Sequence, residues 1–376
     1  MRNQTLRGEE FMQLLNACDK YCISLIIPTH RLPNERHTDK LKVKSVIGNA
    51  VLLLENKYDK TIAKKLIDKI NQLASEIDYN YNSEGIGIFV SENQSLRYSF
   101  PFKVSEKIVA GNSFEIRDLL YHVQITEPLS LIMLSEKHVR LFVGNINGIS
   151  EVKGSEFPSE FVDLYEYSTP SRGSSSMNPQ MRSFEHEKST LEATRFIHFI
   201  RHTDKAIKPY ITENTRIVVF GSSKLIHYFK DNSLLADKII GEKEGNYDHL
   251  STEELRQKTT DILIDFIHQH IQQKIDALSE KIGTLKAVSG IQDVWSVAQE
   301  GRGLELLVEK DFRTPGFLEK GKELFIHLHP PKSEHITITD AVDDLIELVM
   351  DKGGHVYIAK DGELSAYGNI ALTTRY

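Results

Sequence analysis

Basic side chains are concentrated in one stretch of the sequence, where they could bind the phosphates of a nucleic acid. Ten Lys and Arg residues and five Asp and Glu residues lie between Arg31 and Gln72, a local net charge of +5 in a chain of net charge −7. Positive charge gathered on one face attracts polyanions. A helix face in contact with solvent has the same pattern, so the stretch predicts either an RNA-binding face or an ordinary solvated one.

Two histidines have the spacing of a metal pair. His198 and His202 are four residues apart in a predicted helix, which places both imidazoles on one face. No Glu stands beside His198, as a metalloprotease motif would require, and Arg201 between them disfavours a cation. The sequence therefore predicts no metal ion, and no cofactor motif is found elsewhere.

The segment Gly221-Ser222-Ser223-Lys224 lies where a predicted strand passes into a helix. Free backbone amides at such a junction can hold an anion. The segment lacks the glycine spacing of a phosphate-binding loop, so we favour a helix N-cap formed by Ser222 or Ser223.

A long polar segment, residues 168–183, is rich in Ser, Pro and Gly and poor in aliphatic residues. Loops of this length are uncommon inside compact domains and are often functional. We expect it to be a mobile loop within a domain.

The composition limits the class of protein. The chain has 376 residues, enough for two or three domains, and its 40% hydrophobic and 26% charged residues are ordinary for a folded protein. The negative net charge excludes a globally basic nucleic-acid coat protein. Cys18 and Cys22 form neither a disulfide framework nor a complete zinc site. No apolar run has the length of a signal peptide or a membrane span, so we expect a cytoplasmic protein without a membrane partner.

Strands alternate with helices along the whole chain, which predicts an α/β fold. The apolar patterns divide it into three domains, residues 1–126, 127–283 and 284–376. The expected strands are 22–27, 85–90, 96–100, 129–134, 139–143, 149–153, 216–220, 304–308, 336–338, 355–359 and 369–376. The expected helices are 8–16, 41–55, 62–77, 187–207, one opening at 221–224, one opening with the capping box Ser251–Glu254, 291–299 and 341–350.

The order of several segments resembles that of the archaeo-eukaryotic class-1 peptide release factors, a family that includes Pelota. Ile23–His30 and Gly85–Val90 resemble the first domain of the family. Pro128–Phe142 and Val218–Ser222 resemble its middle, ribonuclease-H-like domain. Gly301–Val308 and Gly368–Tyr376 resemble its third domain, which is similar to kink-turn-binding ribosomal proteins. The likeness is closest to the bacterial branch of this family.

The resemblance assigns the basic stretch to the codon-reading region. The family carries Asn-Ile-Lys-Ser at a helix start, and the similar position here reads Leu41-Lys42-Val43-Lys44-Ser45. Lys44 and Ser45 match and the Asn is missing, which puts stop-codon reading in doubt. The resemblance implies RNA contacts by Lys42, Lys44 and Ser45, and the local positive charge adds Lys64 and Lys65 as candidate RNA contacts.

The resemblance also assigns the loop 168–183 to the tip that carries Gly-Gly-Gln, where the Gln positions the water that cleaves peptidyl-tRNA. This loop contains Gly173 and Gln180 but no Gly-Gly-Gln, so we expect hydrolysis to be lost. Arg172 and Arg182 could still contact phosphates.

The expected function is a binding factor that engages the ribosome or a structured RNA (tRNA or rRNA), with a translational GTPase as a further partner, in rescue, hibernation or quality control. Two alternatives stay open. One is an active peptidyl-tRNA hydrolase or nuclease that uses the loop 168–183. The other is an interaction scaffold without an RNA role.

Overall fold

The computed structural model describes residues 21–31, 35–135, 138–160, 197–322 and 324–376. The chain divides into two compact units, one made of residues 1–124 and 270–376 and the other of residues 125–269. Several separate sheets with accompanying helices confirm the predicted α/β class. The three-domain division at 126/127 and 283/284 stays a prediction.

The first sheet of the larger unit is antiparallel and has the order β3-β2-β1-β4. β1 is buried on both faces because its apolar residues do not alternate with polar ones. Ile23, Leu25 and Ile27 pack in one hydrophobic cluster, whereas Cys22 and Ile26 belong to another. The strands are β1 (Cys22–Pro28), β2 (Gly85–Val90), β3 (Ser95–Phe100) and β4 (Lys107–Gly111).

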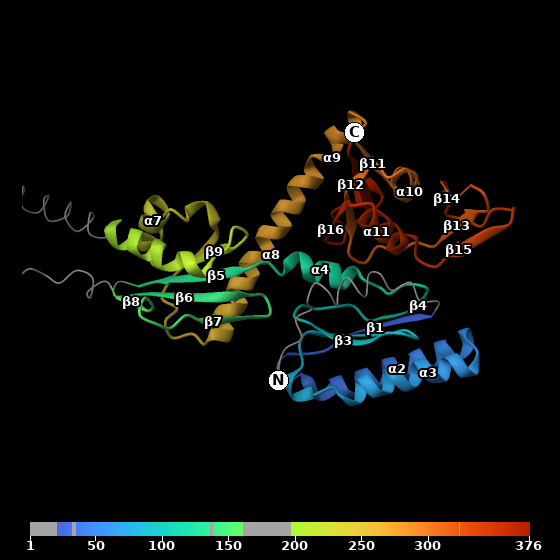
Figure 1. Ribbon diagram of the computed structural model, residues 1–376, viewed down its shortest axis with the longest axis horizontal. Helices are drawn as coiled ribbons and strands as arrows, with labels where there is room; N and C mark the ends of the chain where they lie inside the picture. The colour runs from blue at the N-terminus through green and yellow to red at the C-terminus, as the bar shows by residue number, and fades with distance from the viewer. Residues whose placement is uncertain (1–20, 32–34, 136–137, 161–196, 323) are drawn as a thin grey trace, which may run out of the picture. The chain divides into compact units, whose positions relative to one another are not determined.

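Two helices, α2 (Asp39–Lys57) and α3 (Lys60–Ser75), lie side by side on one face of this sheet (Figure 1). Apolar residues at helical spacing form their buried side. They are Val43, Val46, Ala50 and Leu54 of α2 and Ala63, Leu66 and Ile70 of α3. The charged side chains between these positions are therefore left on the outer side, and both predicted helices are confirmed.

The other face of the first sheet shares a core with the C-terminal part of the chain. Phe89 and Phe100 lie in the same hydrophobic cluster as Trp295 and Leu345. The C-terminal sheet has the order β11-β17-β12-β16. Its strands and helices are β11 (Ala287–Ser289), α10 (Ile291–Gln299), β12 (Gly303–Glu309), α11 (Ala341–Asp351), β16 (His355–Ala359) and β17 (Ile370–Thr374), preceded by α9 (Leu278–Gly283).

A small three-stranded sheet completes this unit, in the order β14-β13-β15. Its strands are β13 (Gly316–Glu319), β14 (Ile326–His327) and β15 (His335–Ile338). Sequence patterns predicted β15 but missed β13, β14, β4 and the helix α4 (Arg117–Ile125), because these elements are short or carry charged residues at positions that turn out to be buried.

A buried ion network joins the segment before α4 to the segment before α11. The Arg117 side chain is fully buried, and its guanidinium donates to both oxygens of Glu115 at 2.9 and 3.0 Å and to Asp340 Oδ2 at 2.6 Å. It also donates to the Phe312 carbonyl, and Arg313 pairs with Glu115. Burial and the neighbouring Glu115 raise the pKa of Asp343 well above its ordinary value, and Arg117 Nε lies 3.2 Å from Asp343 Oδ1.

The smaller unit contains a mixed sheet of order β10-β9-β5-β6-β7, with β8 paired to β6. β10, β9 and β5 are parallel, and β5, β6 and β7 form the predicted meander. The strands are β5 (Leu129–Leu134), β6 (His138–Asn145), β7 (Gly148–Glu151), β8 (Ser159–Glu160), β9 (Arg216–Gly221) and β10 (Ile239–Glu244).

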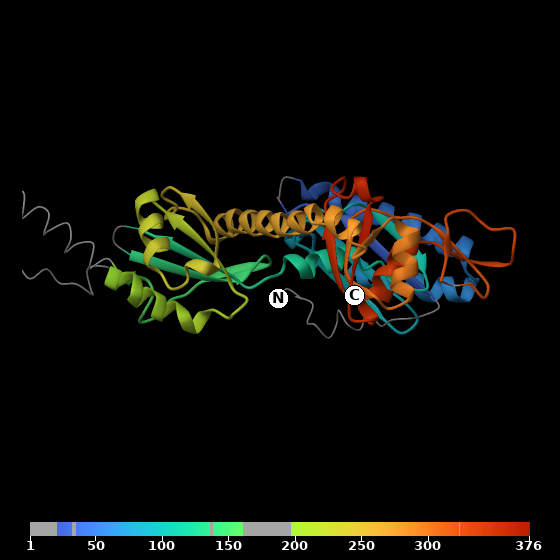
Figure 2. The same ribbon diagram turned by 90° about the horizontal axis from the view of Figure 1, so that it is seen from above.

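Helices cover this sheet. Residues 197–207, which are helical, and α7 (Ser223–Asn232) share one apolar cluster with alternate residues of β5 and β9. α8 (Thr252–Asp276) is one long helix (orange in Figure 2), and it opens at the predicted capping box, where Ser251 and Glu254 exchange hydrogen bonds. None of the helices in the described ranges combines the length and apolarity that a membrane crossing needs.

We expect Arg117→Ala to lower the free energy of unfolding by about 3–5 kcal/mol, because it leaves buried carboxylates without their cation. Urea denaturation of the full chain measures this. Arg302→Ala, which removes an exposed pair with Glu300, is the matched control and should change stability by less than about 1 kcal/mol. Equal effects of the two substitutions would contradict this role for Arg117.

Glu347 on α11 predicts a pH dependence of stability. Burial, with Asp344 nearby, raises the pKa of Glu347 from 4.5 to about 7. The folded state therefore holds this proton more tightly than the unfolded state, and stability falls as pH rises from about 4.5 to about 7. Glu347→Gln should stabilise the protein by about 1 kcal/mol at pH 8 and have little effect near pH 4.5. The expected gain is this small because the carboxyl is partly exposed to solvent.

Thermal melts of Glu347→Gln across this pH range provide the measurement. Glu76→Gln, at an exposed position after α3, is the control and should show no such trend. A constant difference between Glu347→Gln and the unsubstituted chain at all pH values would show that the carboxyl does not titrate as proposed.

Candidate functional site

The outer side of α2 and α3 carries most of the residues for which RNA contacts were predicted. Lys44 and Ser45 lie in the second turn of α2 and are exposed. Lys64 and Lys65 are exposed in the second turn of α3. Lys42 is also exposed, but its ammonium forms an ion pair with Glu106. Within the described ranges, no ion pair engages Lys44, Lys64 or Lys65.

Other basic residues of the same stretch stabilise the fold. Lys69 donates to the carbonyls of Ser91 and Glu92 at 2.9 and 2.7 Å, and Lys57 donates to the Ala110 carbonyl. Arg36 donates to the carbonyls of Asn80 and Arg31. The tertiary structure therefore separates the basic stretch into side chains that tie loops together and side chains free to meet a ligand. The name basic face is used below for Lys40, Lys44, Lys60, Lys64 and Lys65, all exposed.

Acidic residues also reach this surface. Glu55, Asp59 and Asp68 are exposed on or between the same two helices. The face is consequently a mixed one, in which these carboxylates weaken the attraction that the surplus of lysines exerts on phosphates.

The remaining predicted site residues lie outside the described part of the chain. These are Arg172, Gly173, Gln180 and Arg182, together with the whole loop 168–183.

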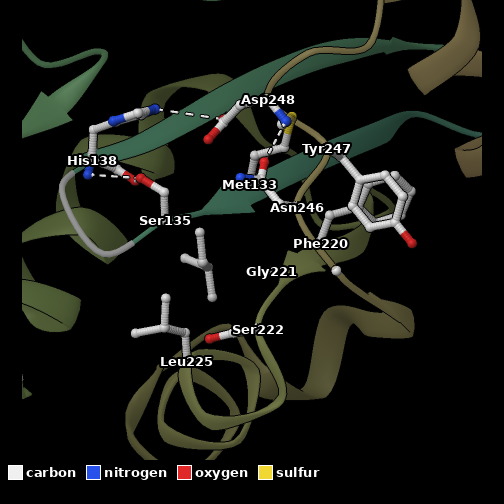
Figure 3. A pocket seen from close by; sticks show the side chains of 12 residues that line it. Met133, Ser135, His138, Phe220, Gly221, Ser222, Leu225, Asn246, Tyr247 and Asp248 are labelled. Carbon is white, nitrogen blue, oxygen red and sulfur yellow. Dashed lines mark hydrogen bonds and ion pairs between the residues drawn. The ribbon is translucent and has the colours of Figure 1, made fainter.

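A crevice of about 490 Å³ opens in the smaller unit at the carboxyl ends of the parallel strands β5, β9 and β10 (Figure 3). Sheets of this kind bind ligands at that edge. Its lining combines apolar residues with hydroxyl, amide, imidazole and carboxylate groups: Met133, Leu134, Ser135, His138, Phe220, Gly221, Ser222, Leu225, Gly245, Asn246, Tyr247 and Asp248.

The geometry of the crevice does not support a catalytic triad. The Ser135 hydroxyl accepts from the His138 amide at 3.0 Å and donates to the His138 carbonyl at 2.9 Å, so it closes the turn between β5 and β6. His138 Nε2 lies 3.6 Å from Asp248 Oδ1, and Arg140 lies 3.7 Å from the same oxygen. These contacts position Asp248 at the rim. The crevice can hold a small ligand with an apolar body, but it presents no activated nucleophile among the described residues.

The structure confirms the position of the predicted N-cap but not its hydrogen bond. Ser222 stands at the N-cap position of α7, but its side chain makes no capping hydrogen bond. The amides of the first turn therefore have no cap from Ser222, at a point where the helix meets the crevice.

One group of carboxylates in the described ranges has the spacing of a metal site, namely Glu115, Asp340 and Asp343. The guanidinium of Arg117 already lies among them and supplies the positive charge. His198 is exposed, and His202 Nε2 lies 3.9 Å from a carboxylate oxygen of Glu156. Sequence reasoning missed both the carboxylate cluster and the crevice, since their residues are far apart in the chain.

Comparisons with known proteins agree with the family resemblance in part of the chain. Residues 130–302, somewhat less than half of the chain, match the model of bacterial archaeo-eukaryotic release factor family 3. The recognition of this family from the sequence is thereby confirmed. None of the curated proteins matches the chain.

Three solved structures illustrate the range of structural likeness. An archaeal translation termination factor, aRF1, is 12% identical, with 98% of each chain covered and a TM-score of 0.26. Pelota from Archaeoglobus fulgidus is 12% identical, with 98% of this chain and 92% of that chain covered and a TM-score of 0.38. Dom34 from S. cerevisiae is 12% identical, with 80% of this chain and 83% of that chain covered and a TM-score of 0.40. TM-scores this low add no argument to the family match.

We expect Gly221→Ala to destabilise the chain by about 1–3 kcal/mol, because the added methyl would lie 2.8 Å from the Leu134 carbonyl oxygen and force β9 away from β5. Urea denaturation provides the measurement. Gly154→Ala is the control, since nothing lies within 4 Å of its new methyl, and it should change stability by less than about 0.5 kcal/mol. If neither substitution changed the free energy of unfolding, β9 and β5 would be able to move apart at the crevice without cost.

Proposed function

We propose that this chain, whose residues 130–302 match bacterial archaeo-eukaryotic release factor family 3, is a release-factor-like translation factor that binds the ribosome or a structured RNA such as tRNA or rRNA. It would act in rescue, hibernation or quality control. A translational GTPase is proposed as a further partner. The domain likenesses to ribonuclease H and to kink-turn-binding ribosomal proteins remain part of this proposal.

The observation that carries the proposal is the basic face on α2 and α3. Its lysines are exposed and, unlike Lys42, Lys57 and Lys69, they are not engaged by the rest of the fold in the described ranges. Lysines of this kind bind phosphates without reading sequence, and such binding weakens steeply as salt rises. A ribosome offers many closely spaced phosphates, which compensates for a net charge of −7 on the whole chain.

The absence of Gly-Gly-Gln from the 376-residue sequence supports a factor that does not cleave peptidyl-tRNA. The missing Asn before Lys44 likewise supports a factor that does not read stop codons. Contact of Arg172 and Arg182 with phosphates is proposed on the family resemblance. Gly173 and Gln180 are the catalytic candidates of the alternative in which the loop is an active hydrolase.

The triple substitution Lys44→Glu, Lys64→Glu and Lys65→Glu should weaken ribosome binding about tenfold or more at roughly 0.1 M salt, because three phosphate contacts are replaced by repulsion. Co-sedimentation of the purified chain with ribosomes, with the bound fraction titrated against ribosome concentration, measures the loss.

The control triple substitution changes Lys286, Lys332 and Lys360 to Glu. These lysines are exposed and the net charge changes by the same amount, so a specific face predicts near-normal binding for the control. Absence of the unsubstituted chain from every ribosomal fraction at low salt would contradict the proposed function. Equal loss in both triple variants would point to non-specific attraction.

The two alternatives give different results in the same preparation. An active hydrolase would release peptide from ribosome-bound peptidyl-tRNA, and deletion of residues 172–181 would abolish this release. A scaffold without an RNA role would keep all of its partner binding in the Lys44, Lys64 and Lys65 variant. Our proposal predicts that the unsubstituted chain releases no peptide and that the Lys44, Lys64 and Lys65 variant binds ribosomes weakly.

A further inference from the structure

A histidine and a buried aspartate form a hydrogen-bonded pair next to the basic face. The His30 ring Nδ1 lies 2.7 Å from Asp39 Oδ1. The other oxygen of Asp39 accepts from the His30 backbone amide at 3.0 Å and from Asn82 Nδ2 at 2.7 Å. The pair therefore joins three segments, the end of β1, the start of α2 and the chain leading into β2.

The two members of the pair differ sharply in exposure. The Asp39 side chain is 1% exposed, whereas the His30 side chain is 44% exposed. An ionised carboxylate can only accept hydrogen bonds, so Nδ1 of the ring must donate. The second ring nitrogen, Nε2, is left over. It has no partner among the described residues and is not among their buried unsatisfied atoms, so it is open to solvent.

Neighbouring contacts hold the backbone on both sides of His30. The Thr29 hydroxyl donates to the Ser83 carbonyl at 2.9 Å, and Arg36 donates to the Arg31 and Asn80 carbonyls. A tie between backbone segments alone would need only the His30 amide and Asn82 as donors to Asp39. The additional bond to the ring orients a partly exposed imidazole and leaves its Nε2 available to a ligand.

The ligand chemistry follows from what surrounds the ring. Lys40 follows Asp39 directly in α2, and Lys44 lies one turn further along the same side; both are exposed. Because His30 bonds Asp39, its ring lies at the same end of α2 as Lys40 and Lys44. The ribose 2′-hydroxyl of RNA can donate or accept a hydrogen bond, which suits Nε2 in either protonation state of the ring.

We propose that His30, oriented by Asp39, hydrogen-bonds a ribose 2′-hydroxyl of RNA held by the basic face, so that this face selects RNA over DNA. This inference rests on the proposed function, since it requires that the face bind nucleic acid. A metal role is not supported, because the one group of three potential ligands in the described ranges does not include His30.

The test compares one hairpin sequence made as RNA and as DNA, with affinities for the full chain measured by fluorescence anisotropy. The unsubstituted chain should prefer the RNA by about five- to tenfold, the effect of one good hydrogen bond. His30→Ala should remove this preference by weakening RNA binding, while DNA affinity stays within about twofold of the unsubstituted value. His355→Ala, at an exposed histidine in β16, is the control and should keep the preference.

Two conservative variants separate ligand contact from a purely structural role. The amide of Asn can take the place of Nδ1 and keep the bond to Asp39, whereas the amide of Gln reaches the place of Nε2. His30→Asn should therefore fold normally but lose the preference for RNA, and His30→Gln should retain part of it. A structural role would make His30→Asn equivalent to the unsubstituted chain.

The outcomes distinguish the failure of this inference from that of the proposed function. Equal affinity of the unsubstituted chain for RNA and DNA, or equal weakening of both by His30→Ala, overturns the inference and leaves the proposed function standing. If neither hairpin nor ribosomes bind the unsubstituted chain, both the inference and the proposed function are wrong.

Discussion

The larger unit depends on the burial of one guanidinium group. Arg117 is fully buried, and a cation there is stable only because Glu115, Asp340 and the Phe312 carbonyl all accept from it. These partners come from segments about 200 residues apart in the chain. A second set of contacts acts beside it, where Lys107 lies 2.8 Å from Asp118 and 3.1 Å from Asp311. Together they fix the first sheet against the C-terminal elements that share its core.

This arrangement decides which surfaces are left for function. The first sheet uses one face for the shared core and the other for α2 and α3, so only the outer side of these helices meets solvent. Some of the basic residues in this stretch are used internally. What remains is Lys40 and Lys44 of α2 and Lys60, Lys64 and Lys65 of α3, with the imidazole of His30 bonded to Asp39 at the start of α2. The basic face and His30 are therefore positioned by packing and not by local sequence alone.

The evidence for family and the evidence for binding come from different parts of the chain. The family match over residues 130–302 covers most of the smaller unit, including the crevice and the sequence positions of the loop 168–183. The proposed RNA contacts of α2 and α3 lie before the matched residues. A translation factor that lacks Gly-Gly-Gln would rely on binding surfaces elsewhere, and the basic face is the surface that we propose.

Local patterns in the sequence were sufficient for the elements with strong periodicity. Apolar runs such as Ile23–Ile27 and the helical spacing of Leu66 and Ile70 predict β1 and α3, because burial of these residues is imposed by their own chemistry. The sequence also determined the surplus of positive charge between Arg31 and Gln72 and the absence of Gly-Gly-Gln. Only the tertiary structure decided that Lys42 and Lys69 are engaged while Lys44 is free, that Asp39 orients His30, and that Arg117 joins distant carboxylates. These outcomes depend on which segments meet across the fold, and contacts between residues far apart in the chain leave no periodic signal in the sequence.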